Sequence, residues 1–226
     1  MEIKTKIPIS REILVDMETP LSVYRKLADG PYTYLFESVE GGENWARYSL
    51  IGLESSKIIF VKKNQIEVEL NGEIIESFHC DDPLDYIDKL HKSFEIKQID
   101  DLPLFNGGLV GYFGYDCVRY IESRLVDSEP PDLIGTPDAL FMISDEVAVF
   151  DNLKNKLHLI VLVESEDDQE KANIRLDELV DTLKESLPFE DFNKPVKSIE
   201  ETDFVSGFGE EEFKLSVKNA KEYIES

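Results

Sequence analysis

The fold of this chain is decided by residues 34–52, which read YLFESVEGGENWARYSLIG. The two ends of this stretch, residues 32–36 and 48–53, are rich in aromatic and branched side chains, which suit a half-buried pleated sheet. Gly41 and Gly42 supply a permissive backbone between them. The stretch therefore predicts a β-hairpin with a charged turn.

Polar side chains gather where this hairpin turns. Glu37 and Ser38 close the first predicted strand, and Arg47 and Ser49 open the second. This set could hold a zwitterion, because Glu37 or a backbone carbonyl would bind an ammonium group while Arg47 and Ser38 would bind a carboxylate. An exposed Glu–Arg pair beside a turn explains the same spacing, since surface pairs are common and contribute little stability. The spacing alone leaves both interpretations open.

The sequence outside the hairpin predicts further strands that follow one another and a smaller number of helices. Residues 65–70 alternate between apolar and acidic side chains, and Asn71-Gly72 is a strong signal for a two-residue hairpin turn. Sequential strands favour antiparallel pairing, so we expect an α+β fold with antiparallel sheets and flanking helices. Strands are expected at 3–14 (an edge strand), 56–61, 65–70, 73–78, 108–112, 139–150 and 156–163, and helices at 116–121 and 167–187 and from residues 19, 82 and 210.

The composition excludes several classes of partner. The chain has 226 residues, and 42% of them are hydrophobic, which is enough for a packed core. Its 48 acidic against 24 basic residues give a net charge of −24, so neither nucleic acid nor an anionic membrane is an expected partner. No apolar run is long enough to span a bilayer, and the first residues lack a signal-peptide pattern. With Cys80 and Cys117 alone, a disulfide framework is not expected, which favours the cytoplasm.

Five motifs follow one another along the chain: 19–24 (TPLSVY), 36–43 (FESVEGGE), 47–52 (RYSLIG), 106–116 (NGGLVGYFGYD) and 137–141 (PDALF). Together they resemble the amino-terminal, regulatory part of the anthranilate synthase component I family of chorismate-utilising enzymes. The resemblance covers nearly the whole chain in order and extends into the final helix, through Phe213, Val217, Tyr223 and Ile224.

The resemblance implies a domain plan. Residues 1–187 would form the amino-terminal regulatory domain with the tryptophan site, residues 188–208 a linker, and residues 209–226 the start of a truncated chorismate-binding domain. The apolar stripe of the final helix would pack on that domain. The family's chorismate-handling and metal-ligating motifs are not found in this sequence, so we predict no catalytic residue, no metal ligand and no cofactor here. In the full-length subunit Mg²⁺ would bind in the carboxy-terminal domain, and a glutamine amidotransferase subunit (component II) would supply ammonia.

The resemblance also assigns the polar hairpin a role. The family's feedback site for L-tryptophan uses the Glu-Ser pair at this strand end, so Glu37 and Ser38 would line the polar end of the inhibitor. Arg47 lies at or next to the family's basic position, and Tyr48 and Ser49 are further candidates. The side chains of 34, 36 and 50 could form part of an indole slot, although ordinary core packing explains each of them as well.

Three alternatives remain open at this point. The chain could be the corresponding part of aminodeoxychorismate synthase component I, from the folate pathway, whose domain can hold tryptophan structurally. It could be a non-catalytic amino-acid-binding module. It could also be a structural half of the scaffold without a ligand.

Overall fold

The computed structural model describes residues 4–37, 47–122, 124–125, 132–187 and 198–225. The chain divides into two compact units, Met1–Leu187 and Pro188–Ser226. Ser38, the predicted turn around Gly41 and Gly42, and residues 188–197 of the predicted linker lie outside the described residues.

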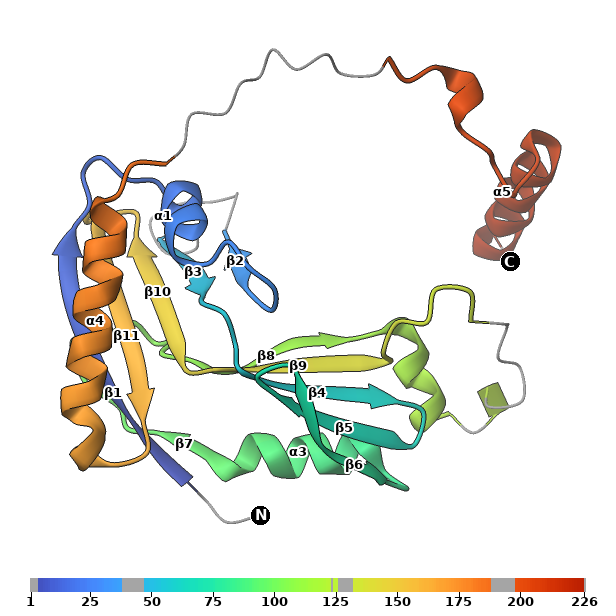
Figure 1. The fold of residues 1–226 in the computed structure, drawn as a ribbon. Helices are drawn as coiled ribbons and strands as arrows, with labels where there is room; N and C mark the ends of the chain where they lie inside the picture. Colours follow the sequence, from blue (N-terminus) through green and yellow to red (C-terminus); the bar gives the residue numbers. More distant parts are fainter. Residues whose placement is uncertain (1–3, 38–46, 123, 126–131, 188–197, 226) are drawn as a thin grey trace. The chain divides into compact units, whose positions relative to one another are not determined.

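The first unit is built mainly from strands (Figure 1). The strands are β1 (Lys4–Leu14), β2 (Tyr34–Phe36), β3 (Tyr48–Gly52), β4 (Lys57–Lys62), β5 (Gln65–Leu70), β6 (Glu73–His79), β7 (Phe94–Ile96), β8 (Gly108–Phe113), β9 (Ala139–Ser144), β10 (Glu146–Asp151) and β11 (Lys156–Val163). The helices are α1 (Pro20–Leu27), α3 (Pro83–Ser93) and α4 (Gln169–Lys184), with 3-10 helices at Tyr115–Tyr120 and Glu166–Asp168.

One sheet has six strands in the order β2-β3-β10-β11-β1-β7. Helices α1 and α4 cover one of its faces (Figure 1), where Val23 and Leu176 are fully buried in a core with Ile51 and Leu159. Its neighbouring strands are antiparallel except β1 and β7, which run parallel at the start of β1. The prediction of an edge strand at 3–14 is therefore wrong for the strand as a whole, because β1 stands between β11 and β7 in the sheet order. Residues 4–6 pair with β7 alone and residues 7–14 pair with β11 alone.

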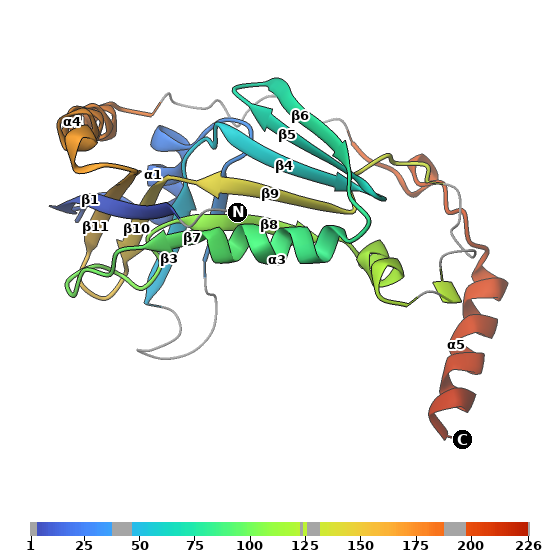
Figure 2. The ribbon, with the colours of Figure 1, turned by 90° about the horizontal axis from the view of Figure 1, so that it is seen from below.

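The other sheet has five strands in the order β6-β5-β4-β9-β8, and helix α3 packs on one of its faces (Figure 2). Ile66 and Val68 of β5 pack in one core with α3, as their alternation predicts, whereas Leu70 at the end of the strand is exposed and lies outside that core. Asn71 and Gly72 join β5 to β6 with φ angles of 53° and 83°, which is the backbone of a two-residue hairpin turn. The predicted α+β class, with antiparallel sheets and flanking helices, is confirmed.

The chain passes between the two sheets at four points, and two of these passages lie side by side. Residues 53–56 lead from β3 to β4, and Asp145 alone leads from β9 to β10. Leu53 N donates to the carbonyl of Glu146 (3.1 Å) and Ser55 Oγ to the carbonyl of Ile143 (2.7 Å). The prediction of one strand over 139–150 is therefore wrong, because the apolar run is divided between two sheets and is buried in both.

The start of α1 shows how local sequence sets an element boundary. Thr19 caps the helix, because its Oγ1 accepts from Ser22 N (3.1 Å) while Ser22 Oγ accepts from Thr19 N (2.9 Å). Pro20 occupies the first helical position, where no backbone donor is needed. The helix start predicted from Thr19-Pro20 is confirmed.

The second unit carries helix α5 (Glu210–Glu225), preceded by a 3-10 helix at Glu201–Asp203. Acidic residues occupy the first turn of α5, where they complement the helix dipole. All residues of α5 are exposed in this structure, including Phe213, Val217 and Ile224 on its predicted apolar stripe. The packing of this stripe on a chorismate-binding domain stays a prediction.

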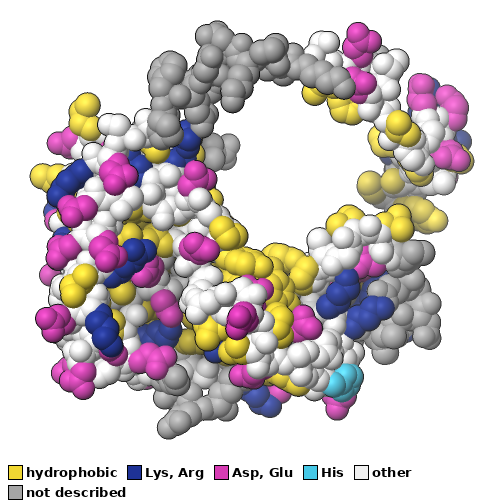
Figure 3. Space-filling model, in the orientation of Figure 1, with side chains coloured by type: hydrophobic (Ala, Val, Ile, Leu, Met, Phe, Trp, Pro, Cys, Tyr) yellow, Lys and Arg dark blue, Asp and Glu magenta, His cyan; other side chains and the backbone are white. Residues whose placement is uncertain are grey.

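The surface carries the strong negative charge of the sequence. Figure 3 shows carboxylates spread over the first unit with fewer lysine and arginine side chains between them, and apolar side chains gathered near its middle. Phe60 and Leu140, on the face of the five-stranded sheet that is turned away from α3, are only partly buried.

Candidate functional site

Arg47 directly precedes β3 and is held by a residue of the neighbouring strand β10. Its Nε lies 3.2 Å from both carboxylate oxygens of Asp151, and its Nη2 lies 2.7 Å from Asp151 Oδ2. The carboxylate side chain is 2% exposed and the arginine side chain 30% exposed. The arginine is thus fixed on one edge and open to solvent on another.

Asp151 is itself fixed by the turn that follows β10. Its Oδ1 accepts from the backbone N–H of Leu153 (3.1 Å) and of Lys154 (3.2 Å). Burial acts to raise the pKa of Asp151, but the hydrogen bonds from Arg47 and from these backbone groups outweigh it and hold the pKa below its ordinary value. The same pairing raises the pKa of Arg47. The pair is therefore ionised throughout the physiological range.

Tyr48 and Ser49 lie on opposite faces of the six-stranded sheet. The Tyr48 ring packs beneath Arg47, with 4.8 Å from the ring centroid to Arg47 Cζ. Ser49 is 2% exposed, pairs with Phe150, and faces the helix side, where Asn152 Nδ2 donates to its Oγ (3.1 Å). The structure therefore brings Arg47 and Tyr48 together but turns Ser49 away from them.

Glu37 and Ser38 are the other two predicted site residues. Glu37 directly follows β2 and is exposed. Ser38 lies outside the described residues. The proposed convergence of Glu37 and Ser38 on a ligand stays a prediction.

Arg47 and Tyr48 line a highly charged hollow of about 460 Å³. It lies on the sheet face opposite α1 and α4, and its other lining residues are Glu12, Asp100, Asp101, Leu102, Pro103, Asp151, Lys154, Lys156 and His158. His158 Nε2 lies 3.8 Å from Glu12 Oε2, and burial lowers the pKa of His158 despite that carboxylate. Because cations and carboxylates alternate and little apolar surface is present, the hollow suits the charged end of a small molecule rather than an aromatic ring.

The apolar candidates in the hairpin divide into core and surface. Tyr34 is buried, its hydroxyl pairs with Ser144 Oγ (2.9 Å), and burial raises its pKa to about 12. Its ring covers Gly52, where an added Cβ would lie only 1.9 Å from Tyr34 Cε1. Phe36 stacks on Tyr34 with 5.0 Å between centroids and is 52% exposed, whereas Leu50 is partly buried in two clusters. Among the three, Phe36 offers the most surface to a ligand.

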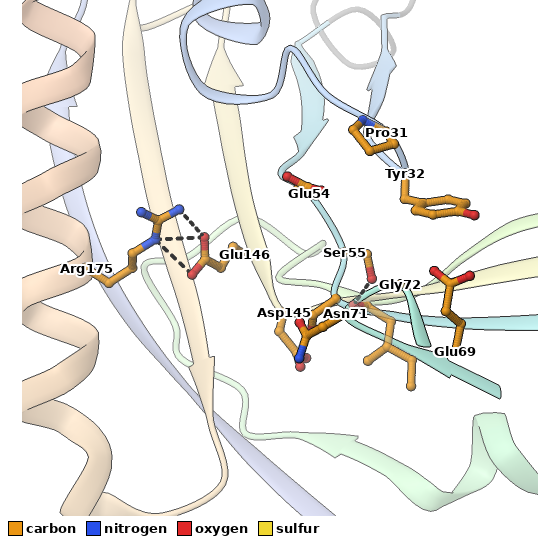
Figure 4. A pocket seen from close by; sticks show the side chains of 12 residues that line it. Pro31, Tyr32, Glu54, Ser55, Glu69, Asn71, Gly72, Asp145, Glu146 and Arg175 are labelled. Carbon is orange, nitrogen blue, oxygen red and sulfur yellow. Dashed lines mark hydrogen bonds and ion pairs between the residues drawn. The ribbon is translucent and has the colours of Figure 1, made fainter. Parts of the chain in front are cut away.

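A larger hollow, of about 700 Å³, lies where the chain passes between the sheets (Figure 4). Arg175 of α4 reaches Glu146 on its wall, with Nε 3.1 Å from both carboxylate oxygens and Nη2 3.0 Å from Oε2. Asp145 on the same wall is paired with Lys6. No local pattern in the sequence indicates this hollow, because its residues come from five separate stretches with no shared motif.

Within the described ranges, no three His, Cys, Asp or Glu side chains lie close enough together to hold a metal ion. No helix in the part of the chain that the structure describes is long and apolar enough to cross a membrane.

Known proteins resemble this chain in sequence and in structure. The family model described as chorismate binding enzyme matches residues 34–226. Anthranilate synthase component 1 of Pseudomonas aeruginosa is 43% identical over 97% of this chain and 45% of its own length, and that of Neisseria meningitidis serogroup B is 44% identical with the same coverage. The crystal structure of anthranilate synthase component I from Streptococcus pneumoniae TIGR4 matches with a TM-score of 0.52 and 28% identity, over 79% of this chain and 38% of that chain. The chain thus spans a little under half the length of the curated relatives it matches.

Proposed function

Because this chain belongs to the chorismate binding enzyme family, we propose that it is the amino-terminal part of an anthranilate synthase component I. The observation that carries this proposal is the identity of 43–45% to proteins of that name over 97% of the chain. The full-length subunit would act as a carbon–oxygen lyase of tryptophan biosynthesis. It would convert chorismate and ammonia to anthranilate and pyruvate, with ammonia supplied by a glutamine amidotransferase subunit.

In this proposal the chain alone is inactive, because chorismate and Mg²⁺ would bind in the carboxy-terminal domain. The test is the fluorescence of anthranilate formed from chorismate, ammonium and Mg²⁺. We expect formation by the full-length subunit and none by residues 1–226. Formation of a different product, such as aminodeoxychorismate, by the full-length subunit would overturn the assignment.

We also propose that this chain contributes the feedback site for L-tryptophan. Its support is the partly exposed guanidinium of Arg47, which stands beside a charged hollow in the hairpin that carries Glu37 and Ser38. The ligand carboxylate would bind Arg47 above Tyr48, and the ammonium would bind Glu37, with Ser38 donating to the carboxylate. Ser49 would position the strand from its other face. Phe36, on the same face as Tyr48, would contact the indole.

Inhibition by this site requires that tryptophan bind one state of the subunit more tightly than the other. The test is calorimetric titration of L-tryptophan into the full-length subunit and into residues 1–226, with tryptophan inhibition of anthranilate formation measured in parallel. We expect saturable binding by the full-length subunit and its loss in Arg47→Gln. Arg124→Gln is the matched control, since Arg124 pairs with nearby Glu122 among the residues that the structure describes and its side chain is 84% exposed. If the unaltered full-length subunit bound no tryptophan, the feedback site would have to be abandoned.

A further inference from the structure

We infer that Asp151 is a positioning residue of the amino-acid site, which turns Arg47 so that one edge of its guanidinium faces the carboxylate of the ligand. This inference rests on the proposed tryptophan site. It adds a residue that lies 104 positions from Arg47 in the sequence and belongs to a different hairpin.

The guanidinium of Arg47 has two edges that can each bind a carboxylate. A guanidinium can bind a carboxylate through its Nε and one Nη, or through its two Nη groups. Asp151 occupies the first edge, through Nε and Nη2. In the described part of the chain no hydrogen bond from Arg47 Nη1 is found, so the second edge can take a second carboxylate in bidentate geometry.

Both partners of Arg47 are rigid. The Asp151 side chain is 2% exposed and accepts from two backbone N–H groups of the turn that follows it. Within the sheet, Asp151 pairs with Tyr48 on one side and with Lys156 on the other. The Tyr48 ring packs against Arg47 as well. Because few orientations satisfy both contacts, the free edge is presented in a fixed direction, which lowers the entropy lost when a ligand binds.

The next residue in the same turn holds the strand that carries Arg47. Asn152 N donates to the carbonyl of Arg47 (2.8 Å), and Asn152 Nδ2 donates to Ser49 Oγ (3.1 Å). The turn after β10 therefore fixes both the backbone and the side chain of Arg47. This explains why Ser49, although buried on the opposite face, belongs to the same arrangement.

The experiment compares two ligands that differ in the carboxylate alone. L-Tryptophan and tryptamine share the indole and the ammonium group, but tryptamine has no carboxylate. Calorimetry on the full-length subunit measures both affinities for the unaltered protein and for Asp151→Asn. We expect the affinity for tryptophan to fall about 10-fold, as for a hydrogen bond to a charged group, and the affinity for tryptamine to change by less than about 2-fold.

The strand β10 supplies a matched control. Glu146, at its other end, holds Arg175 in the same geometry as Asp151 holds Arg47. Glu146→Gln should leave the ratio of the two affinities unchanged. Asp151→Glu keeps the charge but displaces the carboxylate by one methylene, so it should also lower the ratio, and it replaces Asp151→Asn if that variant does not fold by circular dichroism.

The outcomes separate this inference from the site on which it rests. Equal losses for both ligands, or no loss for either, in Asp151→Asn would overturn the positioning role and leave the tryptophan site standing. A lower ratio in Glu146→Gln would also overturn it, because the effect would then follow from any lost ion pair on β10. Absence of tryptophan binding by the unaltered subunit would refute the site itself.

Discussion

Gly52→Ala tests how the β2–β3 hairpin is packed. The new Cβ would lie 1.9 Å from Cε1 of Tyr34, so the ring must withdraw by about 1.6 Å to reach an ordinary carbon contact of ~3.5 Å. The ring is buried and its hydroxyl pairs with Ser144, so withdrawal breaks that bond. Overpacking costs about 1–3 kcal/mol and a lost hydrogen bond about 1 kcal/mol. We expect a loss of about 3 kcal/mol in the free energy of unfolding.

The measurement is urea unfolding of residues 1–226 followed by far-ultraviolet circular dichroism, with thermal unfolding as a second probe. A loss of about 3 kcal/mol corresponds to a fall in Tm of roughly 6–12 °C for a unit of this size. Gly30→Ala is the control, because its Cβ would approach nothing closer than Glu54 Oε2 at 3.6 Å. In a Tyr34→Leu background the same Gly52→Ala change should cost less than about 1 kcal/mol, since the ring is gone. A loss below about 0.5 kcal/mol in the unaltered background would refute the packing argument.

Three other results are expected. Gly111→Ala should destabilise the chain more than Gly52→Ala, because its Cβ would lie 1.9 Å from the backbone carbonyl oxygen of Leu140, which cannot rotate away; an equal or smaller loss in urea unfolding would contradict this. The pKa of Tyr34 is raised to about 12, so the buried neutral hydroxyl contributes a part of the free energy of unfolding that is fully present below about pH 10 and is lost as the pH rises toward 12. Tyr34→Phe should flatten that decline, and an unchanged slope of unfolding free energy against pH would count against the buried hydroxyl. Asp151 has a lowered pKa, so its contribution is present above its ordinary value near 3.8 and lost as the pH falls through the folded value; Asp151→Asn should reduce the acid dependence of unfolding, and a dependence equal to that of the unaltered chain would argue against the Arg47 pair.

Local signals in the sequence predicted those elements whose cause is local. Alternation over 65–70 and the Asn71-Gly72 pair specify a hairpin because both the side-chain period and the turn backbone are properties of neighbouring residues. The capped start of α1 was predictable for the same reason. The division of the apolar run at 139–150 is marked only by the polar residues Ser144, Asp145 and Glu146, because burial in either sheet selects the same apolar residue types on both sides of them.

The candidate site was predictable only in part, because its geometry depends on contacts between distant residues. The hairpin pattern placed Arg47 and Tyr48 next to each other, and they do meet in space. The sequence could not indicate that Asp151 holds Arg47, since an Asp-Asn pair after a strand reads as an ordinary turn and nothing local reveals a partner 104 residues away. Alternation along a strand would also place Arg47 and Ser49, two residues apart, on the same face. They separate because Arg47 precedes β3 and its side chain lies with Asp151 and Tyr48.

The two neighbouring passages between the sheets, at 53–56 and at Asp145, differ in how they tolerate changes of chain length. The passage at 53–56 contains four residues between strands, so an inserted or deleted residue there can be absorbed by the connection. Asp145 is the whole of the other passage. Losing or gaining one residue at that point would invert the alternation of β10, moving Ala148 and Phe150 away from the helices and Val147 and Val149 toward them. Natural variation in length should therefore be found between β3 and β4 and be absent between β9 and β10.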